Sequence, residues 1–537
     1  MLCQHKAVVL IVAVSGLAMS VSATGQEVPS DPVLRQALAQ VRPGGGGGTD
    51  TTGPDVIVGE IQDSGDCCPN SETTIITPQS TVGSIVAYGL GTSSCNIGSM
   101  NISWVANSPL HPIIPQNMYR LETVNGATRF EQLGQSWSKY AFTALTFYVC
   151  GPNPTGSTSS CNGSGGSVLG VGCSDPYTAG RNATQSSAGP RYQCNPFTGD
   201  FPDTATVRAT WPATTDSTSR RLRVNTTDLS NAAHPGALFF GECMYVTKDD
   251  ATYGNSKNNA SYRRFTVGAG NSITLQGAIG GIGTHRMQPA IFAWKNNGLG
   301  TDVADPNVMI SDVAPPQTFT PPNGVPVGDG WVYVGSKATS LGSGFYHYEY
   351  AIENQNSDRG VGAATINFPA GTQISNASWK QIDAHSGVVS EDATRNAVWI
   401  QTIGATSINW HSPNTYSAAT PTLGSYIRWG TMYNFRFDAN IAPVNNGVVT
   451  VGYYKPGSPA TINATAWVPG APPPPPCYAN CDSSTSNPVL NVNDFQCFTN
   501  AFAAGQQYAN CDNSTVPPTL NVNDFQCFLN KFAAGCS

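Results

Sequence analysis

The sequence predicts a mainly β protein with two β-sandwich-like domains, followed by a small α-helical tail of two loop-helix repeats. Three observations lead to this fold class. Charged residues make up only 11% of the chain, while glycine, proline and small polar residues are abundant, as in turn-rich β proteins. Short strand-like runs separated by Gly, Pro, Asn and Ser recur between residues 55 and 467. The end of the chain contains two tandem copies of one sequence unit.

The amino terminus predicts export. An apolar run follows Lys6 and ends near Met19, and the small residues that precede residue 24 have the pattern of a cleavage site. We therefore predict a signal peptide at residues 1–23 and a secreted protein, extracellular or associated with the cell surface. Residues 24–54 are expected to be a flexible linker because they contain five consecutive glycines. No later run approaches the ~18 to 20 apolar residues of a spanning helix, so we expect no transmembrane segment.

The first body region, residues 55–312, is expected to be a disulfide-containing β-rich domain. Within it, only residues 129–142 indicate a helix or an ordered loop. Eight cysteines lie between Cys67 and Cys243, and six lie between Cys477 and Cys536. Because both numbers are even, we expect disulfides closed within each region in an oxidising compartment.

A proline-rich linker at residues 313–326 precedes a second β domain at residues 327–467. In this domain Tyr346, Tyr348 and Tyr350 alternate with polar residues, which is the pattern of a strand with one buried face. We predict an immunoglobulin-like or fibronectin-like β-sandwich. Residues 468–477 include five successive prolines and are expected to form an extended spacer.

The tail, residues 478–537, carries the tandem repeat. Residues 478–505 match residues 508–535 with an offset of 30, and 22 of the 28 paired positions are identical. In each unit, short polar side chains are followed by phenylalanines at helical spacing, such as Phe495, Phe498 and Phe502. We therefore predict a loop and one amphipathic helix in each unit, with each unit completing the core of the other.

The oxygen-bearing side chains of each loop are candidate calcium ligands. Hard cations prefer several oxygen ligands from one turn of chain, and alternate residues point the same way. The expected ligands are Asn480, Asp482, Ser484, Asn491 and Asp494 in the first unit and Asn510, Asp512, Ser514, Asn521 and Asp524 in the second.

The repeated LNVND segments, the two-unit organisation and the ending Gly535, Cys536, Ser537 resemble a dockerin domain of the variant that ends in Gly-Cys. The resemblance covers about a ninth of the chain. It implies two EF-hand-like calcium loops and a cohesin-like or envelope anchoring partner. The family's final Asp-Gly is missing, and about three residues are inserted around Pro488 and around Pro517, so we expect weak calcium binding.

The same resemblance implies which side chains contact the partner. In dockerins these occupy the tenth and eleventh loop positions, which correspond to Val492 and Asn493 in the first unit and to Val522 and Asn523 in the second. Because both copies carry the same pair, the resemblance implies two near-equivalent docking faces related by a pseudo-twofold axis. The alternative is that the valines pack inside the tail, as valines often do.

The tail cysteines are expected to be disulfide-bonded, because small domains bury little apolar area and need such links. Within the units, we expect Cys481 to pair with Cys497 and Cys511 with Cys527. Cys477 and Cys536 would then close the ends of the tail.

The body has no recognisable catalytic motif in its sequence. Glu349 and Glu353 lie four apart in an expected strand, which places them about 13 Å apart, too far for a glycosidase pair, and we expect both to be solvated. Aromatic residues of the second domain are candidates for a carbohydrate platform but are expected to be sandwich core. These are Trp331, Tyr333, Trp410, Trp429 and Tyr433.

These observations favour a secreted, non-catalytic surface or matrix protein displayed through the tail, with carbohydrate as a possible ligand of the body. The alternative is an extracellular polysaccharide-active hydrolase that carries the tail. A third hypothesis is a structural or adhesive protein that the tail only anchors. The net charge of −7 with no basic run argues against nucleic acid as a partner.

Overall fold

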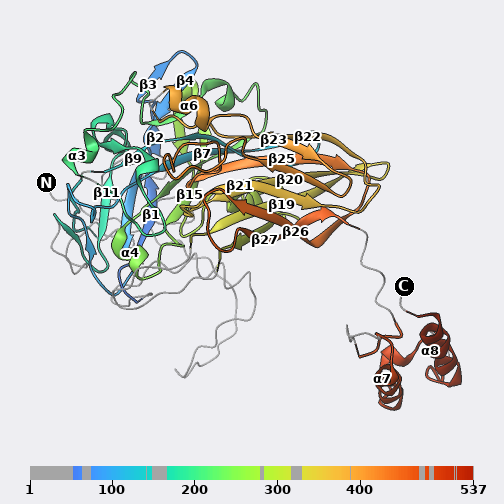
Figure 1. Ribbon diagram of the computed structural model, residues 1–537. Coiled ribbons are helices and arrows are strands. Elements are labelled where there is room, and N and C mark those ends of the chain that lie inside the picture. The colour runs from blue at the N-terminus through green and yellow to red at the C-terminus, as the bar shows by residue number, and fades with distance from the viewer. Residues whose placement is uncertain are drawn as a thin grey trace, which may run out of the picture. The chain divides into compact units, whose positions relative to one another are not determined.

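The computed structural model describes residues 52–62, 74–140, 142–147, 166–202, 204–277, 283–315, 329–386, 389–470, 478–482, 489–512, 514–515 and 517–535. It has several antiparallel sheets and two C-terminal helices, so the predicted mainly β fold class is confirmed (Figure 1). The predicted signal peptide, most of both linkers and of the spacer, Ser484, Cys477 and Cys536 lie outside the described residues.

The first body region packs a large antiparallel sheet against a three-stranded one. The large sheet has the order β2-β16-β15-β14-β7-β8-β13-β4-β3, with β17 beside β15, and the small sheet has the order β1-β5-β11. Side chains from both sheets, including Val58 and Met118, share one buried apolar cluster. The strands are β1 Val56–Gln62, β2 Thr74–Ile76, β3 Ser80–Val82, β4 Ile85–Tyr88, β5 Gly91–Asn96, β6 Ile102–Ser103, β7 Gln116–Val124, β8 Ala127–Gln135, β9 Ser138–Lys139, β10 Val168–Leu169, β11 Ser174–Tyr177, β12 Ala188–Gly189, β13 Leu222–Asn225, β14 Leu238–Met244, β15 Ala260–Val267, β16 Ile273–Leu275 and β17 Thr284–His285.

The prediction of a helix or ordered loop at residues 129–142 is wrong over most of its length, because this stretch begins inside strand β8. β8 is hydrogen-bonded to β7 and β13, and all its residues except Arg129 are buried. A strand covered on both faces lacks the alternation of apolar and polar residues that marks a strand with one solvated face. That missing alternation explains the error.

The second body region is a sandwich of two five-stranded sheets, with orders β18-β19-β20-β25-β22 and β23-β24-β21-β26-β27. Tyr348, Tyr350, Trp410 and Tyr433 lie in the apolar cluster between the sheets, as expected of sandwich core. The strands are β18 Met309–Val313, β19 Val332–Gly342, β20 Phe345–Asn354, β21 Val361–Asn367, β22 Ile374–Lys380, β23 Ile400–Ile403, β24 Ser407–His411, β25 Thr431–Ala439, β26 Pro443–Tyr453 and β27 Thr461–Pro469.

Strand β18 precedes most of the proline-rich segment at residues 313–326, yet it pairs with β19 along its whole length, from Met309 opposite Ser336 to Val313 opposite Val332. The second sandwich therefore takes one strand from the chain before that segment. The helices are α2 Ala179–Asn182, η2 Gln185–Ser187, η3 Arg191–Gln193, α3 Ala205–Arg208, η4 Thr226–Leu229, α4 Lys248–Thr252, η5 Ala269–Asn271, α5 Phe292–Asn297, α6 Val389–Arg395, α7 Val492–Ala503, η6 Gln507–Ala509 and α8 Val522–Ala534.

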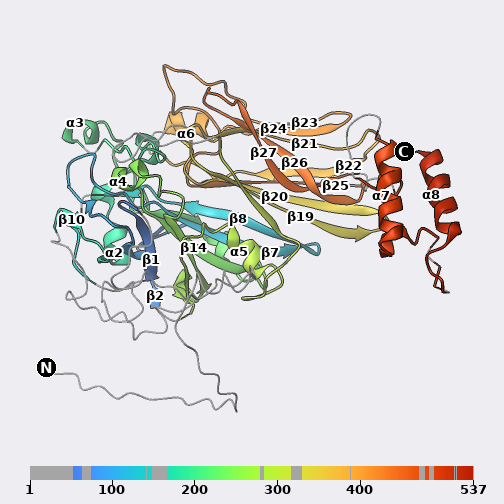
Figure 2. The same cartoon turned by 90° about the horizontal axis from the view of Figure 1, so that it is seen from below.

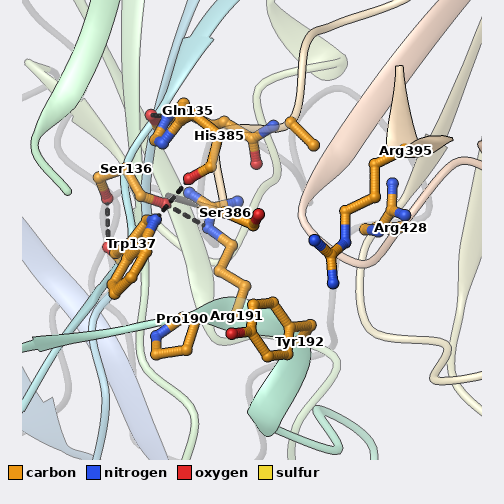
Figure 3. A pocket seen from close by; sticks show the side chains of 11 residues that line it. Gln135, Ser136, Trp137, Pro190, Arg191, Tyr192, His385, Ser386, Arg395 and Arg428 are labelled. Carbon is orange, nitrogen blue, oxygen red and sulfur yellow. Dashed lines mark hydrogen bonds between the residues drawn. The ribbon is translucent and has the colours of Figure 1, made fainter. Parts of the chain in front are cut away.

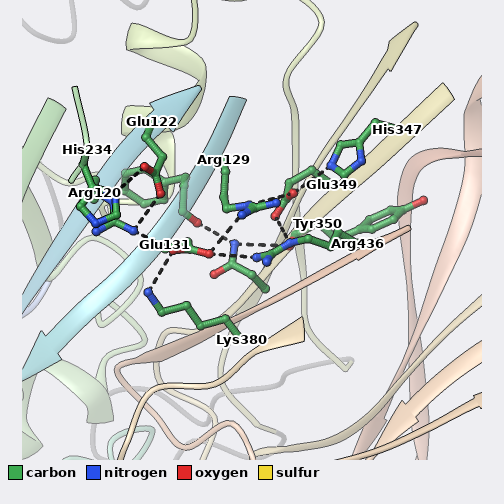
Figure 4. A network of polar contacts seen from close by, with 12 residues as sticks. Arg120, Glu122, Arg129, Glu131, His234, His347, Glu349, Tyr350, Lys380 and Arg436 are labelled. Carbon is green, nitrogen blue, oxygen red and sulfur yellow. Dashed lines mark hydrogen bonds and ion pairs between the residues drawn. The ribbon is translucent and has the colours of Figure 1, made fainter. Parts of the chain in front are cut away.

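Charged side chains join the two body regions (Figure 4). Glu131 on β8 accepts hydrogen bonds from Arg436 on β25, at 2.9 Å, and from Lys380 on β22, at 3.0 Å. Arg129 donates to Glu349 on β20 at 3.2 Å, and Arg436 donates to the same carboxylate at 3.1 Å. Glu131 also accepts from Arg120 of its own region at 3.1 Å. Because each carboxylate bonds cations from both regions, these ion pairs hold β8 against the second sandwich.

The expectation that Glu349 and Glu353 are solvated is wrong, since each is only 1% exposed. Glu349 is buried because Arg129 of the first region and Arg436 of the second neutralise it at the junction. Its partner Arg129 lies 220 residues away in the sequence. A strand pattern identifies the face on which a residue lies, but it does not identify what covers that face.

The expectation of disulfides closed within the first region holds for only some of its described cysteines. Cys95 and Cys173 are disulfide-bonded, whereas Cys194 and Cys243 are free and buried. Cys243 packs within the core of the first region, and Cys194 lies in an aromatic cluster with Phe201 and Trp429. Both serve as small apolar side chains, a common role for a buried free cysteine.

In the tail, helices α7 and α8 lie alongside each other (Figure 2) and share a buried core that includes Phe498 and Phe528. Within the described part of the chain, no helix has the length and apolarity needed to cross a bilayer.

Candidate functional site

The two tail helices begin in the same way. Asn491 caps α7, and its side-chain oxygen accepts from the backbone N–H of Asn493 at 2.8 Å. Asp494 reaches back to accept from the Asn491 N–H at 2.9 Å, which completes a capping box. In α8 the equivalent bonds, made by Asn521 and Asp524, are both 2.8 Å long. These bonds fix the first turn of each helix.

This cap geometry turns the residues after each cap toward solvent. Val492 is 78% exposed and Val522 is 77% exposed, and Asn493 and Asn523 beside them are exposed as well. The alternative that these valines pack inside the tail is therefore wrong. The structure brings each Val-Asn pair to the surface at the start of its helix. These are the two surfaces that the resemblance predicts to dock, and we call them the docking faces.

A pseudo-twofold arrangement relates the two units. The rings of Phe498 and Phe528, which occupy equivalent positions, stack with centroids 4.2 Å apart. The rings of Tyr478 and Tyr508, also equivalent, stack at 4.9 Å. Equivalent residues of two copies contact each other where a twofold axis passes between the copies. The docking faces are therefore equivalent by the internal symmetry of the tail, as well as by sequence.

Disulfides tie each loop to its own helix. Cys481 is bonded to Cys497, with Cα atoms 5.7 Å apart, and Cys511 is bonded to Cys527, with Cα atoms 5.8 Å apart. These are the two pairings predicted within the units. Both disulfides link the start of a loop to the first turns of the following helix, so they support the loops without any ion.

The second loop gathers the oxygens expected to hold calcium. The backbone N–H of Ser514 donates to Asn510 Oδ1 and to Asp512 Oδ1, each at 2.9 Å, so these two oxygens approach a common point. Asp524 Oδ1 accepts from the N–H of Asp512 at 3.3 Å, which places the last carboxylate beside the first. A carboxylate oxygen that accepts one N–H keeps a lone pair for a cation. These oxygens are of the kind that calcium prefers, but the described residues include no group of three or more His, Cys, Asp or Glu that could hold a metal ion, and two carboxylates per loop are few for strong binding.

In the body, the structure brings together two carboxyls that the sequence does not pair, because they lie on different regions. Glu242 on β14 accepts from the Tyr119 hydroxyl at 3.0 Å and from the backbone N–H of Ala290 at 2.6 Å. Burial, together with the nearby Glu242 carboxyl, raises the pKa of Glu353 well above its ordinary value. The two glutamates are 3% and 1% exposed, so they are enclosed by the junction.

No protein-family model matches this chain, and no curated protein matches it. The function of the chain therefore has to be inferred from the geometry of the sites themselves.

Proposed function

We propose that this chain is a secreted, non-catalytic surface or matrix protein that its tail holds at the cell envelope. The observation that carries the proposal is the nearly equal exposure of Val492 and Val522, 78% and 77%, at the starts of two helices of identical cap geometry. Each docking face engages a cohesin-like or other envelope anchoring partner. Because the faces are equivalent, either face alone is sufficient to bind the anchoring partner.

An exposed valine beside an asparagine suits recognition. Burying an apolar side chain against a partner contributes roughly 1.5 to 3 kcal/mol, and the neighbouring amide supplies directional hydrogen bonds. The capping boxes and the disulfides hold both side chains in place before a partner arrives. A preordered face loses little entropy on binding. The tail is therefore built as a rigid two-sided module.

Calcium has a supporting role in this proposal. The side chains of Asn510, Asp512 and Asp524 are the ones that would hold the ion in the second loop, where it would neutralise their clustered negative charge. The first turn of α8 directly follows this loop, so an ordered loop also orders the second docking face.

The hydrolase alternative has less support from the geometry. Its strongest carboxyl pair, Glu242 and Glu353, is buried at the junction, and a polysaccharide would have to separate the two body regions to reach it. Of the aromatic candidates for a carbohydrate platform, Trp410 and Tyr433 are buried in the sandwich core and Trp429 in an aromatic cluster.

The direct test compares the full chain with a chain that ends at residue 470. β27 ends at Pro469, so the shorter chain keeps every described strand of the body. Both proteins are mixed with cell envelopes isolated from the producing organism and sedimented. We expect the full chain in the pellet and the shorter chain in the supernatant. Equal sedimentation of the two would contradict display through the tail.

A further inference from the structure

The junction of the two body regions contains a small pocket outside the tail (Figure 3). Its walls come from the end of β8, from η3, from residues 384–386, from α6 and from Arg428, so both body regions contribute. In Figure 3, Arg395 and Arg428 lie on the side of the pocket opposite Trp137. Pockets between domains are common ligand sites because their groups converge from separate elements.

The pocket wall is cationic. It contains Arg191, Arg395 and Arg428, and the described residues that line it include no carboxylate. The Arg191 guanidinium donates to oxygens that carry no full charge. These are the carbonyls of Ser136 at 2.6 Å, Gln116 at 2.8 Å and Gly430 at 2.9 Å and the amide oxygen of Asn117 at 2.9 Å. The positive charge of this guanidinium is therefore not neutralised by a direct partner.

Two guanidinium groups in the wall have unused donors. The Nε atoms of Arg395 and Arg428 are buried and have no hydrogen-bond partner among the described residues. Only 3% of the Arg395 side chain is exposed, and its ion-pair partners Glu391 and Asp392 both lie at Nη1, at 2.7 and 4.0 Å, which leaves Nε unoccupied. A buried donor without an acceptor costs about 1 to 3 kcal/mol, and more when it is charged. An acceptor placed in the pocket would remove that cost.

The aromatic neighbours keep both arginines in position. The Arg395 guanidinium lies over the ring of Tyr192 at 4.8 Å, and that of Arg428 lies over the ring of Tyr426 at 4.4 Å. Cation-π contacts of this kind hold the planar groups without using their N–H donors. The two Nε donors therefore remain available to a ligand.

The size of the pocket limits the ligand. Its volume is about 40 Å³, and an adjoining pocket of about 30 Å³ shares Arg191, Tyr192 and Arg428. The adjoining pocket is also lined by Asp358 and Lys455, which form an ion pair with each other. At roughly 10 to 15 Å³ per water-sized probe, the first pocket holds about three waters, or one carboxylate group. A planar carboxylate also matches the geometry of a guanidinium fork.

We propose that this pocket binds the carboxylate of an acidic ligand, with Arg395 and Arg428 as the donors that recognise it. The carboxylate lies against the two unpartnered Nε atoms. A small remainder of the ligand extends past Arg428 into the adjoining pocket, whereas a sugar ring, which is larger than that pocket, extends out through the open side of the first pocket. Two sources share this chemistry, a free small acid and an acidic sugar. The site is independent of the tail and of its partner.

The test uses the full chain and saturation-transfer difference NMR with two probes, acetate and D-galacturonate, at fixed ionic strength in chloride. Glucose serves as the uncharged comparison for the sugar. The proteins are the wild type, R395Q, R428Q and R181Q, and Arg181 is an exposed arginine on α2 outside both pockets. Circular dichroism checks that each variant is folded.

We expect the wild type and R181Q to bind equally, and R395Q and R428Q to bind about tenfold more weakly, because each loses charge-assisted hydrogen bonds. Binding of acetate as well as galacturonate indicates any small acid, and binding of galacturonate alone indicates an acidic sugar. If R395Q or R428Q does not fold, R395K or R428K replaces it, since lysine keeps the charge and loses the fork. Equal binding by all variants, or no binding of either acid by the wild type, would overturn the proposal.

Discussion

Tyr478 and Tyr508 exchange hydrogen bonds across the tail: each hydroxyl donates to the backbone carbonyl of the other residue. The reciprocal bonds, together with the stacking of the two rings at 4.9 Å, lie where the repeat units meet. The two units therefore stabilise each other, and a destabilising change in one unit should lower the stability of both units equally.

The first prediction concerns this reciprocity. Replacing Tyr478 or Tyr508 by Phe removes one hydrogen bond and leaves the stacked ring, so each variant should lose about 1 kcal/mol of tail stability. Hydrogen exchange of the full chain, followed by mass spectrometry, measures the effect on α7 and α8 separately. We expect both helices to lose protection by the same amount in either variant. Loss confined to the helix of the substituted unit would contradict mutual stabilisation.

The second prediction concerns calcium. Asp512 is exposed and lies outside the cap of α8, so Asp512→Asn removes a ligand charge while the cap formed by Asn521 and Asp524 stays intact. Calcium should raise the hydrogen-exchange protection of the second loop in the wild type and have a smaller effect in D512N, since an ion that binds only the folded loop stabilises it by mass action. Identical protection in calcium and in chelator would refute the metal hypothesis and leave the disulfides and caps as the support.

The third prediction concerns the cysteines. Mass spectrometry of the unreduced, digested chain should recover the Cys481–Cys497 and Cys511–Cys527 pairs and no bridge between the body and the tail. A thiol reagent should label Cys194 and Cys243 only after unfolding, because both are buried and burial raises the pKa of both thiols well above the ordinary value. Labelling of either cysteine in the native protein would show that its core opens.

The fourth prediction concerns the junction. Glu131→Gln leaves the buried cations Arg120 and Arg436 without their shared carboxylate, so it should lower the free energy of unfolding by about 3 to 5 kcal/mol. The control is Asp312→Asn, which breaks an exposed pair with Lys257 and should cost less than about 1 kcal/mol. Urea unfolding of the full chain measures both. Equal small effects would mean that these ion pairs contribute little to the junction.

The pH dependence of the same site follows from its pKa. Burial raises the pKa of Glu131, but Lys380 and Arg436 outweigh burial and lower the pKa to about 2. Because the folded-state pKa lies below the unfolded value of about 4.5, the stability that Glu131 contributes is fully present above pH 4.5 and is lost as the pH falls toward 2. The difference in unfolding free energy between the wild type and E131Q should therefore shrink in acid.

The fifth prediction concerns His385, which lines the arginine pocket. Burial, with a smaller contribution from Arg223, lowers the pKa of His385 to about 4, while its Nε2 bonds the Gln135 carbonyl at 2.6 Å. A lowered pKa means that the unfolded chain binds the proton first, so stability should fall as the pH drops from 6.5 to 4. At about 1.4 kcal/mol per pH unit the loss is up to about 3 kcal/mol. Unfolding curves of H385Q should lack this part of the pH dependence; an unchanged dependence would contradict it.

The tail and the sandwich were predictable from the sequence because their signals are local. The repeat of LNVND fixed the two loop-helix units, and the alternation around Tyr348 fixed one sandwich strand. The sequence alone does not decide the exposure of Val492, since a valine after a cap can face either way, depending on the cap bonds. The capping box made by Asp494 settled the question.

The junction and its pocket were not predictable, because they depend on contacts between distant segments. Arg191, Arg395 and Arg428 come from three separate segments, and nothing near each of them in the sequence identifies the other two. In the sequence, Glu349 has the pattern of a solvated strand residue. In the fold, Arg129 covers it. The sequence gives one general indication. Charged residues are only 11% of the chain, which indicates that the charged side chains that do occur have specific roles.

The central claim is that the tail has two equivalent docking faces. The measurement that tests it most directly is the fraction of full-length protein that sediments with isolated envelopes, compared among the wild type, V492D, V522D and the double variant. The control is Leu529→Asp, which places the same charge at another exposed apolar position of α8. We predict that each single variant and the control sediment like the wild type, and that the double variant remains in the supernatant with its helices intact by circular dichroism. Loss of sedimentation in one single variant, or retention of the double variant, would contradict the claim.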